Sequence, residues 1–291
     1  MVINKHGSFY LRSGWGTKII QAVETDDMIF SPSKEKLAID NIGLGRVMIK
    51  ALRYWADASG LTTEVKVQGG ISENRERLFD LISENDRYFQ KPGSLLLLHR
   101  NIALNKENAT AWYWAFNEMD KQSFTKDDFV EGLHYYLAVN GMTIRKEAVE
   151  KEFNCFKNTY IREKKFDIKT IMDEDTYPLL APLRLLRVNE EKRIEKNYLN
   201  KMEIPLLILV YMIAKDNQEE SESGGQVSID KLMEDKCQIG KYYPTRYSKL
   251  IDMLLEAENK KLLTLNNNFG NRIIEFSHMD YDRLLYDYFT E

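Results

Sequence analysis

A single segment, residues 42–55, constrains the fold of this chain most, because it places apolar and basic residues on opposite faces of one helix. The apolar stripe has the i, i+3, i+4, i+7 spacing of a buried helix face and consists of Met48, Ala51, Leu52 and Trp55. The opposite face, over an arc of roughly 60°, carries Arg46, Lys50 and Arg53. Cations this close repel one another. The pattern therefore predicts a helix that docks by its apolar face and turns its basic face to water or to a phosphate backbone.

Length and charge limit the class of protein. The 291 residues allow two or three domains, and 43% hydrophobic with 30% charged residues predicts a soluble protein with real cores. Lys and Arg number 41 against 45 Asp and Glu, a net charge of -4. This balance excludes a wholly basic nucleic-acid coat protein but permits a local basic patch.

The chain shows no sign of secretion or membrane insertion. Cys155 and Cys237 lie far apart without CxxC pairing, which fits a reducing cytosol and argues against a zinc ribbon or a disulfide scaffold. The first residues lack the apolar core of a signal peptide. The longest apolar run, Ile204 to Ala214, contains Pro205 and is too short to cross a bilayer. We expect a cytoplasmic protein without a membrane partner.

Helical periodicity dominates and predicts a mainly α protein, in which two winged helix-turn-helix-like units with short β-wings flank a helical middle region. We expect domains at residues 1–70, 71–200 and 201–291. In the first we expect, in order, a helix at about 17–23, a helix ending at Ile42, a turn through Gly43 and Gly45, the basic helix stopping at Gly60, and a strand over Thr62–Val67. This is the order of a winged helix-turn-helix domain.

The middle region, residues 71–200, is predicted to be all-helical, with strongly apolar helices at Leu95–Leu104 and Ala109–Met119. Thr125 is expected to cap a helix that ends at Asn140-Gly141, and Thr143 to cap the next, which runs to Tyr160. The charged stretch at 190–200 is either a connector or a hairpin arm.

The last segment repeats the order of the first. We expect, in sequence, a helix over Ile204–Lys215, an acidic loop over Asn217–Gly225, a short helix capped by Ser228, a long helix over Pro244–Asn259, and a wing formed by Leu262–Leu265 and Arg272–Phe276. Candidate DNA contacts at the start of the long helix are Lys241, Arg246 and Lys249. The acidic residues that follow, Asp252, Glu256 and Glu258, would repel phosphate, so a protein–protein role is favoured for this unit and DNA contact for the first.

Motifs for chemistry are sparse. None of the four histidines, His6, His99, His134 and His278, has metal-ligand spacing, so no built-in metal site is expected. His6 lies close in sequence to Ser8 and Arg12 in a non-helical start, and is a candidate base or orienting group for phosphodiester cleavage. His99, in an apolar helix, is expected to be a core residue. Gly43 and Gly45 lack the preceding strand and the Lys-Ser/Thr of a P-loop, so they are expected to shape a turn.

A dense aromatic cluster is formed by Trp112, Tyr113, Trp114 and Phe116. Exposed rings would stack on bases, whereas buried rings would build a core or a domain interface. The helical spacing favours the core.

Three motifs together resemble a prokaryotic family that accompanies DNA phosphorothioation operons. They are His6-Gly7-Ser8-Phe9-Tyr10-x-Arg12-x-Gly14-Trp15, the segment 42–55, and Ala109-Thr110-Ala111-Trp112-Tyr113-Trp114. The agreement is dense over residues 6–120 and looser in the C-terminal half. The family includes the nicking component of Ssp-type modification systems.

This resemblance implies a DNA-binding, DNA-nicking protein of a phosphorothioate modification, restriction or phage-defence system. It implies double-stranded DNA as a ligand, a cysteine desulfurase and an ATP-dependent sulfurtransferase as partners, and Mg or Mn if nicking is intrinsic. The matching positions nominate His6, Arg12, Arg46, Lys50 and Arg53 as contacts or catalysts. The alternative is a non-enzymatic winged-helix adaptor or transcriptional regulator that binds DNA or partner proteins.

Overall fold

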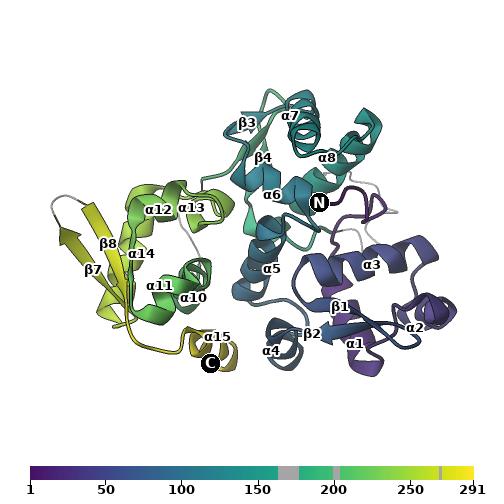
Figure 1. The fold of residues 1–291 in the computed structure, drawn as a ribbon, viewed down its shortest axis with the longest axis horizontal. Coiled ribbons are helices and arrows are strands. Elements are labelled where there is room, and N and C mark those ends of the chain that lie inside the picture. The colour runs from purple at the N-terminus through teal and green to yellow at the C-terminus, as the bar shows by residue number, and fades with distance from the viewer. Residues whose placement is uncertain (163–176, 199–203, 269–270) are drawn as a thin grey trace. The chain divides into compact units, whose positions relative to one another are not determined.

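The computed structural model describes residues 1–162, 177–198, 204–268 and 271–291, which divide into two compact units (Figure 1). The first unit is Met1–Glu195 and the second is Lys196–Glu291. Helices make up 55% and strands 13%, so the predicted mainly α class is confirmed. Within the described residues, no helix combines the length and apolar character needed to cross a membrane. The domain boundaries at residues 70 and 200 stay predictions.

The first unit begins with three helices and a hairpin. They are α1 (Trp15–Thr25), α2 (Glu35–Ile42), α3 (Arg46–Ala58), β1 (Thr62–Val67) and β2 (Gly70–Arg75), with a 3₁₀ turn at Pro32–Lys34 before α2. The predicted strand is confirmed as β1. Its antiparallel partner β2 was not predicted, because Ile71 alone among its six residues favours a strand and the segment forms one only by pairing.

Helix α3 is the segment that the sequence singled out. Gly43 ends α2 in the left-handed conformation with φ 70°, and Gly45 precedes the first turn of α3. The stripe residues Ala51, Leu52 and Trp55 are fully buried, while Met48 is half-buried. Ile49, Tyr54 and Ala56 are buried as well, so the docked face is wider than the stripe. This helix packs against α1, α2 and β1.

The rest of the first unit is helical with one small sheet. Its elements are α4 (Arg77–Asn85), α5 (Pro92–Leu104), α6 (Thr110–Asn117), β3 (Ser123–Phe124), α7 (Lys126–Val139), α8 (Lys146–Tyr160), a 3₁₀ turn at Ala181–Leu183, β4 (Leu186–Val188) and β5 (Ile194–Lys196). The strands pair in the order β3-β5-β4, so the charged stretch at 190–200 contains a hairpin arm. The all-helical prediction is wrong there, because strands of two or three residues are too short to show alternation.

The aromatic cluster on α6 is core, as the helical spacing favoured. Trp112 and Phe116 are 1% exposed, Trp114 6% and Tyr113 8%, which leaves no ring open for base stacking. His99 is fully buried and its Nδ1 lies 2.9 Å from the Tyr160 hydroxyl, so its predicted role as a core histidine is confirmed.

The two predicted caps in this region have different outcomes. Thr125 caps α7 in a reciprocal capping box with Asp128, and the helix ends at Asn140-Gly141 as expected. The prediction for Thr143 is wrong, because α8 begins three residues later. His134 Nε2 lies 2.9 Å from the Ile144 carbonyl oxygen, which ties this stretch of backbone to α7 before the helix begins.

The second unit contains six helices and a three-stranded sheet among its described residues. They are α10 (Leu206–Asp216), α11 (Gln218–Ser223), β6 (Gln226–Ser228), α12 (Ile229–Glu234), α13 (Ile239–Tyr242), α14 (Tyr247–Asn259), β7 (Leu263–Asn268), β8 (Asn271–Phe276) and α15 (Tyr281–Thr290). The strands pair in the order β6-β8-β7. Helix α15 packs along α10.

Several expectations for this unit are confirmed and others are corrected. The hairpin is confirmed, although Phe269 and Gly270 at its turn lie outside the described residues. The Ser228 cap is also confirmed. The acidic loop is wrong in part, because six of its residues form α11, held by the Ser221 hydroxyl that donates to the Ala214 carbonyl at 3.0 Å. Helix α14 begins at Tyr247 rather than Pro244.

We predict that Thr125→Ala lowers the free energy of unfolding by about 1 kcal/mol, because it removes the hydroxyl that accepts from the Asp128 amide. Thr143→Ala is the matched control. It should change stability by less than about 0.5 kcal/mol, since Thr143 is exposed and caps no helix. Urea titrations of both variants measure the difference, and equal losses would contradict the assignment.

Candidate nucleic-acid interface

Acidic residues on neighbouring elements pair with two of the three cations on the basic face of α3. Arg46 is 67% exposed, but its Nε lies 2.8 Å from a carboxylate oxygen of Glu35 on α2. Arg53 is 26% exposed and its Nε donates to Glu64 on β1 at 2.8 Å. Lys50 is exposed and makes no ion pair within the described residues. The carboxylates that pair with this face of α3 therefore come from α2 and β1.

A fourth charged residue, Asp57, shares this face of α3. It lies four residues after Arg53 and seven after Lys50, which places it on the same side of the helix. Its carboxylate accepts from the Asn108 side-chain amide at 2.6 Å. Burial and the nearby charge of Glu64 raise the pKa of Asp57.

Behind Arg53 lies a buried carboxyl group, Glu73, on β2 directly across from Glu64. Its side chain is 1% exposed, and one oxygen accepts from the Thr62 hydroxyl at 2.7 Å. The other oxygen has no hydrogen-bond partner among the described residues and lies 4.0 Å from the Arg53 Nε. Burial raises the pKa of Glu73 to about 7, and the charge of Glu64 adds to the effect, against the Thr62 hydrogen bond and Arg53.

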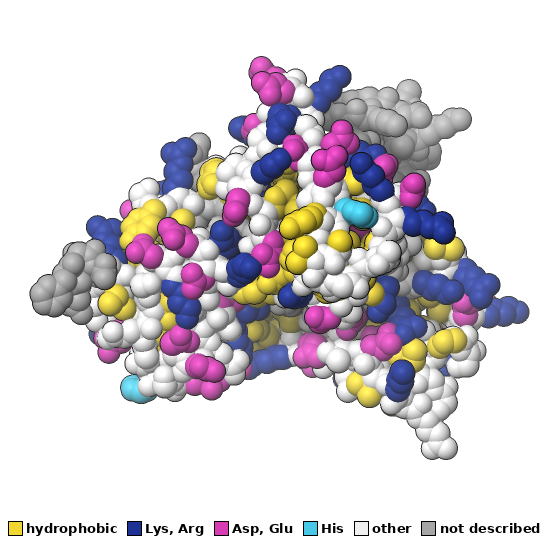
Figure 2. All heavy atoms as spheres, turned by 45° about the horizontal axis from the view of Figure 1, so that its top comes forward, with side chains coloured by type: hydrophobic (Ala, Val, Ile, Leu, Met, Phe, Trp, Pro, Cys, Tyr) yellow, Lys and Arg dark blue, Asp and Glu magenta, His cyan; other side chains and the backbone are white. Residues whose placement is uncertain are grey.

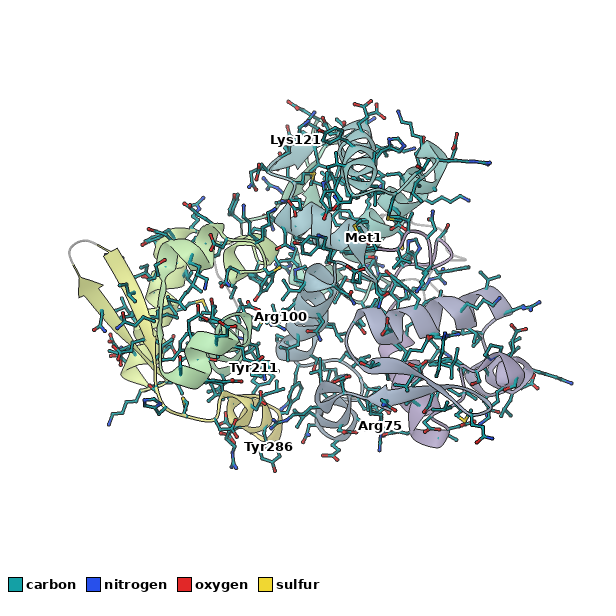
Figure 3. The ribbon with its side chains drawn as sticks, in the orientation of Figure 1. Met1, Arg75, Arg100, Lys121, Tyr211 and Tyr286 are labelled. Atoms are coloured by element: carbon teal, nitrogen blue, oxygen red, sulfur yellow. The ribbon has the colours of Figure 1, made fainter. Side chains whose placement is uncertain are left out.

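The surface around these residues carries mixed charge. Figure 2 shows basic side chains gathered at the right edge of the view, over the end of the first unit that carries α2 and α3, with acidic side chains among them. On β1, Lys66 is exposed and has no ion pair in the described chain. Arg75 of β2, labelled in Figure 3, lies 3.5 Å from Asp80.

His6 is buried beneath the N-terminal segment rather than placed on this surface. Its side chain is 1% exposed, its Nδ1 accepts from the Ser8 amide at 3.1 Å, and its Nε2 lies 3.1 Å from Glu152, which is itself 2% exposed. The Nε2 contact is not aligned as a hydrogen bond. Burial, with the charge of Glu152, raises the pKa of Tyr54 beside this pair. A phosphodiester cannot reach the imidazole in this conformation, and the catalytic role of His6 stays a prediction.

The segment before α1 is tied down along its length. The N-terminal ammonium of Met1, labelled in Figure 3, donates to Glu107 at 2.6 Å. The Val2 amide donates to the Thr110 hydroxyl at 3.0 Å, and the Asn4 amide donates to Glu152. These contacts join the start of the chain to α6 and α8.

Arg12 lies among aromatic rings. Its guanidinium carbon is 5.3 Å from the ring centres of Phe9 and Tyr10 and 5.6 Å from that of Trp15. Cation–π attraction therefore orients this side chain, and its contact with DNA stays a prediction.

The candidate contacts of the second unit lie around the start of α14. Arg246 precedes the first turn and is exposed. Lys249 lies 3.3 Å from Asp252, and Lys241 is half-buried on α13. Their contact with DNA stays a prediction.

The fit of a metal ion can be judged from its possible ligands. Throughout the described residues, no three His, Cys, Asp or Glu side chains are arranged to hold one. Asp57, Glu64 and Glu73 approach one another, but Arg53 is the cation that faces Glu64 and Glu73. No described residue is therefore assigned as a ligand of a resident metal ion.

The sequence missed four acids around α3: Glu35, Asp57, Glu64 and Glu73. Asp57 could have been found, because it falls on the basic face by the same helical spacing as the cations. The other three come from separate elements, and their positions follow from tertiary packing alone.

We predict that Glu73 makes the protein less stable as pH rises. Its pKa is raised in the folded state, so its contribution is full below pH 4.5 and is lost as pH rises through about 7, a change of about 3 kcal/mol. Glu73→Gln should remove this part of the pH dependence. Urea unfolding of both proteins at pH 5 and pH 8 measures it, and the same pH dependence in both would contradict the assignment.

Two solved structures and one family model resemble this chain over almost its whole length. Two solved structures cover 99% of it, and it covers 88% of each: magnesium ion-bound SspB at a TM-score of 0.84 and 19% identity, and SspB at 0.83 and 20%. At this identity the likeness is one of fold. No curated protein matches the chain. A family model described as "Protein of unknown function (DUF4007)" matches residues 3–289. The resemblance seen in the sequence is confirmed, and the chain belongs to the DUF4007 family.

Proposed function

We propose that this chain is a DNA-binding protein of a DNA phosphorothioate modification or defence system, and that it nicks DNA to permit sulfur incorporation. The observation that carries the proposal is the likeness of the fold to SspB over 99% of the chain. The motifs at residues 6–15, 42–55 and 109–114, which resemble the same family, support it independently.

Each unit supplies elements in the order of a winged helix-turn-helix domain. In the first, α1, α2 and α3 precede the β1–β2 hairpin. In the second, α10, β6, α12 and α14 precede the β7–β8 hairpin, and β6 pairs with β8. In such domains the helix before the hairpin enters the major groove. We therefore assign α3 as the recognition helix of the first unit.

Two cations of α3 are available for phosphate contact. Lys50 has no ion pair to break in the described chain, and Arg46 has an exposed one with Glu35. An exposed ion pair contributes about 0–1 kcal/mol, so a phosphate can replace Glu35. Arg53 is held by Glu64 and Glu73, so a phosphate must compete with two carboxylates to reach it.

The location, ligand and partner proteins that we propose follow from the same assignment. We propose a cytoplasmic protein that acts on double-stranded DNA with a cysteine desulfurase and an ATP-dependent sulfurtransferase. Nicking by the chain itself would use Mg or Mn supplied in solution, and the magnesium ion bound in one SspB structure is consistent with this.

A non-enzymatic adaptor or regulator is the second candidate. In its favour, no described residues form a metal-binding group, and Asp252, Glu256 and Glu258 line α14 behind its basic start. Such a protein would bind DNA or partner proteins through its winged units and recruit the enzymes.

We predict that Arg46→Glu with Lys50→Glu lowers duplex affinity at least tenfold without unfolding the protein, because it places two negative charges against the phosphates. The matched control, Lys126→Glu with Lys146→Glu, makes the same change in net charge on exposed lysines of α7 and α8. Fluorescence anisotropy of a labelled duplex, with circular dichroism for folding, measures both. Unchanged affinity and salt dependence in the α3 variant would contradict its assignment as the recognition helix.

For nicking, purified protein should convert supercoiled plasmid to the relaxed form in Mg or Mn. The same double variant of α3 should lose this activity, which distinguishes it from a contaminating nuclease. Plasmid that stays supercoiled with both metals would favour the adaptor.

A further inference from the structure

Arg53 occupies a position that DNA would reach, yet it is bound by acids of its own unit. We infer that Glu64 and Glu73 hold Arg53 in an autoinhibitory contact, and that the first unit binds a phosphate backbone more tightly when either carboxylate loses its charge. This inference rests on the proposed DNA binding of α3 and adds its regulation.

The geometry of the contact is specific. Arg53 follows Lys50 by three residues on the same face of α3 and is 26% exposed, so its guanidinium lies at the edge of the surface. Glu64 is half-exposed and binds it from β1, and Glu73 lies behind it, fully covered, on β2. The β1–β2 register places these two acids directly opposite each other. One cation is thus shared by two cross-strand carboxylates, an arrangement that like-charge repulsion disfavours without Arg53.

Both acidic and basic groups surround Glu73. The charged or titratable groups that face Glu73 or line the hollow beside it are Arg53 and Asp57 from α3, Glu64 from β1, Arg75 from β2, and Glu24, Asp26 and Asp27 at the end of α1. Lys34 pairs with Asp26, Arg87 pairs with Glu24, and Lys5 acts on Asp57. A phosphate approaching Arg53 meets the carboxylates of Glu64 and Glu73, which already bind its guanidinium. Removing one of those charges weakens both the repulsion and the hold on Arg53.

Protonation of Glu73 is the step that can weaken the hold on Arg53. Its second oxygen has no hydrogen-bond partner among the described residues, so the charged form is poorly stabilised where it lies. Burial raises the pKa of Glu73 to about 7. Protonation between pH 8 and pH 6 would leave Arg53 paired with Glu64 alone, at the exposed edge where phosphate competes.

Two exposed lysines could contact the phosphate backbone together with a released Arg53. Lys66 lies two residues after Glu64 on the same face of β1, and both it and Lys50 are exposed without an ion pair in the described chain. Phosphate contact at Arg53 would thus add to contacts made by Lys50 and Lys66.

The test is a salt titration of duplex binding by anisotropy with the full chain. Glu64→Gln and Glu73→Gln should each bind about five- to tenfold more tightly at 0.1 M salt and pH 8, and steepen the slope of log affinity against log salt by about 0.9, the value for one added phosphate contact. Adding Arg53→Gln to either variant should cancel the gain. Affinity of the parent protein should rise from pH 8 to pH 6, and that of Glu73→Gln should not.

Glu131→Gln is the matched control, since it removes one exposed carboxylate charge from the same unit, on a helix, α7, that carries none of Arg53's partners. It should leave the slope unchanged, and an equal gain in this control would overturn the inference. Glu64→Gln keeps the test valid if the buried Glu73→Gln variant folds poorly. Parent-like affinity and slope in Glu64→Gln would overturn the inference while DNA binding stands, whereas no binding by any protein at any pH would overturn the proposed function.

Discussion

The packing of Trp55 against Trp112 is the contact on which the rest of the first unit depends. The two ring centres lie 5.3 Å apart in an edge-to-face arrangement, and both side chains are almost fully buried. The Trp55 indole also donates to the Phe9 carbonyl at 2.9 Å. This contact joins α3, α6 and the N-terminal segment, and it decides which face of α3 is docked. Arg46, Lys50 and Arg53 lie outside as a consequence.

The positive charge of the exposed face of α3 is then reduced by contacts with acidic residues. Glu35 and Glu64 pair with two of its three cations, and Asp57 lies on the face itself. A surface of this kind has weak attraction for phosphate until an acid is displaced or neutralised. The chain as a whole has a similar balance, with a net charge of -4.

Local signals in the sequence account for the parts of the fold that were predicted. The glycine turn, the Thr125 cap, strand β1 and the β7–β8 hairpin each depend on a few adjacent residues. Strand β2 and the small sheet β3-β5-β4 depend on partners far along the chain. The same distinction holds for the site, because the cations share one helix while Glu64 and Glu73 reach Arg53 only after the hairpin forms. Helix α15 could have been predicted, since Tyr281, Leu284, Leu285 and Phe289 follow helical spacing and are all buried.

We propose that α3 of the first unit lies against the DNA backbone. A photo-reactive amino acid placed at Lys50 tests it most directly, with the same group at Lys126 on α7 and at Arg246 before α14 for comparison. We expect irradiation with a duplex to yield a covalent adduct from position 50 in high yield and none from position 126. An adduct confined to position 246 or 126, with none at 50, would contradict it.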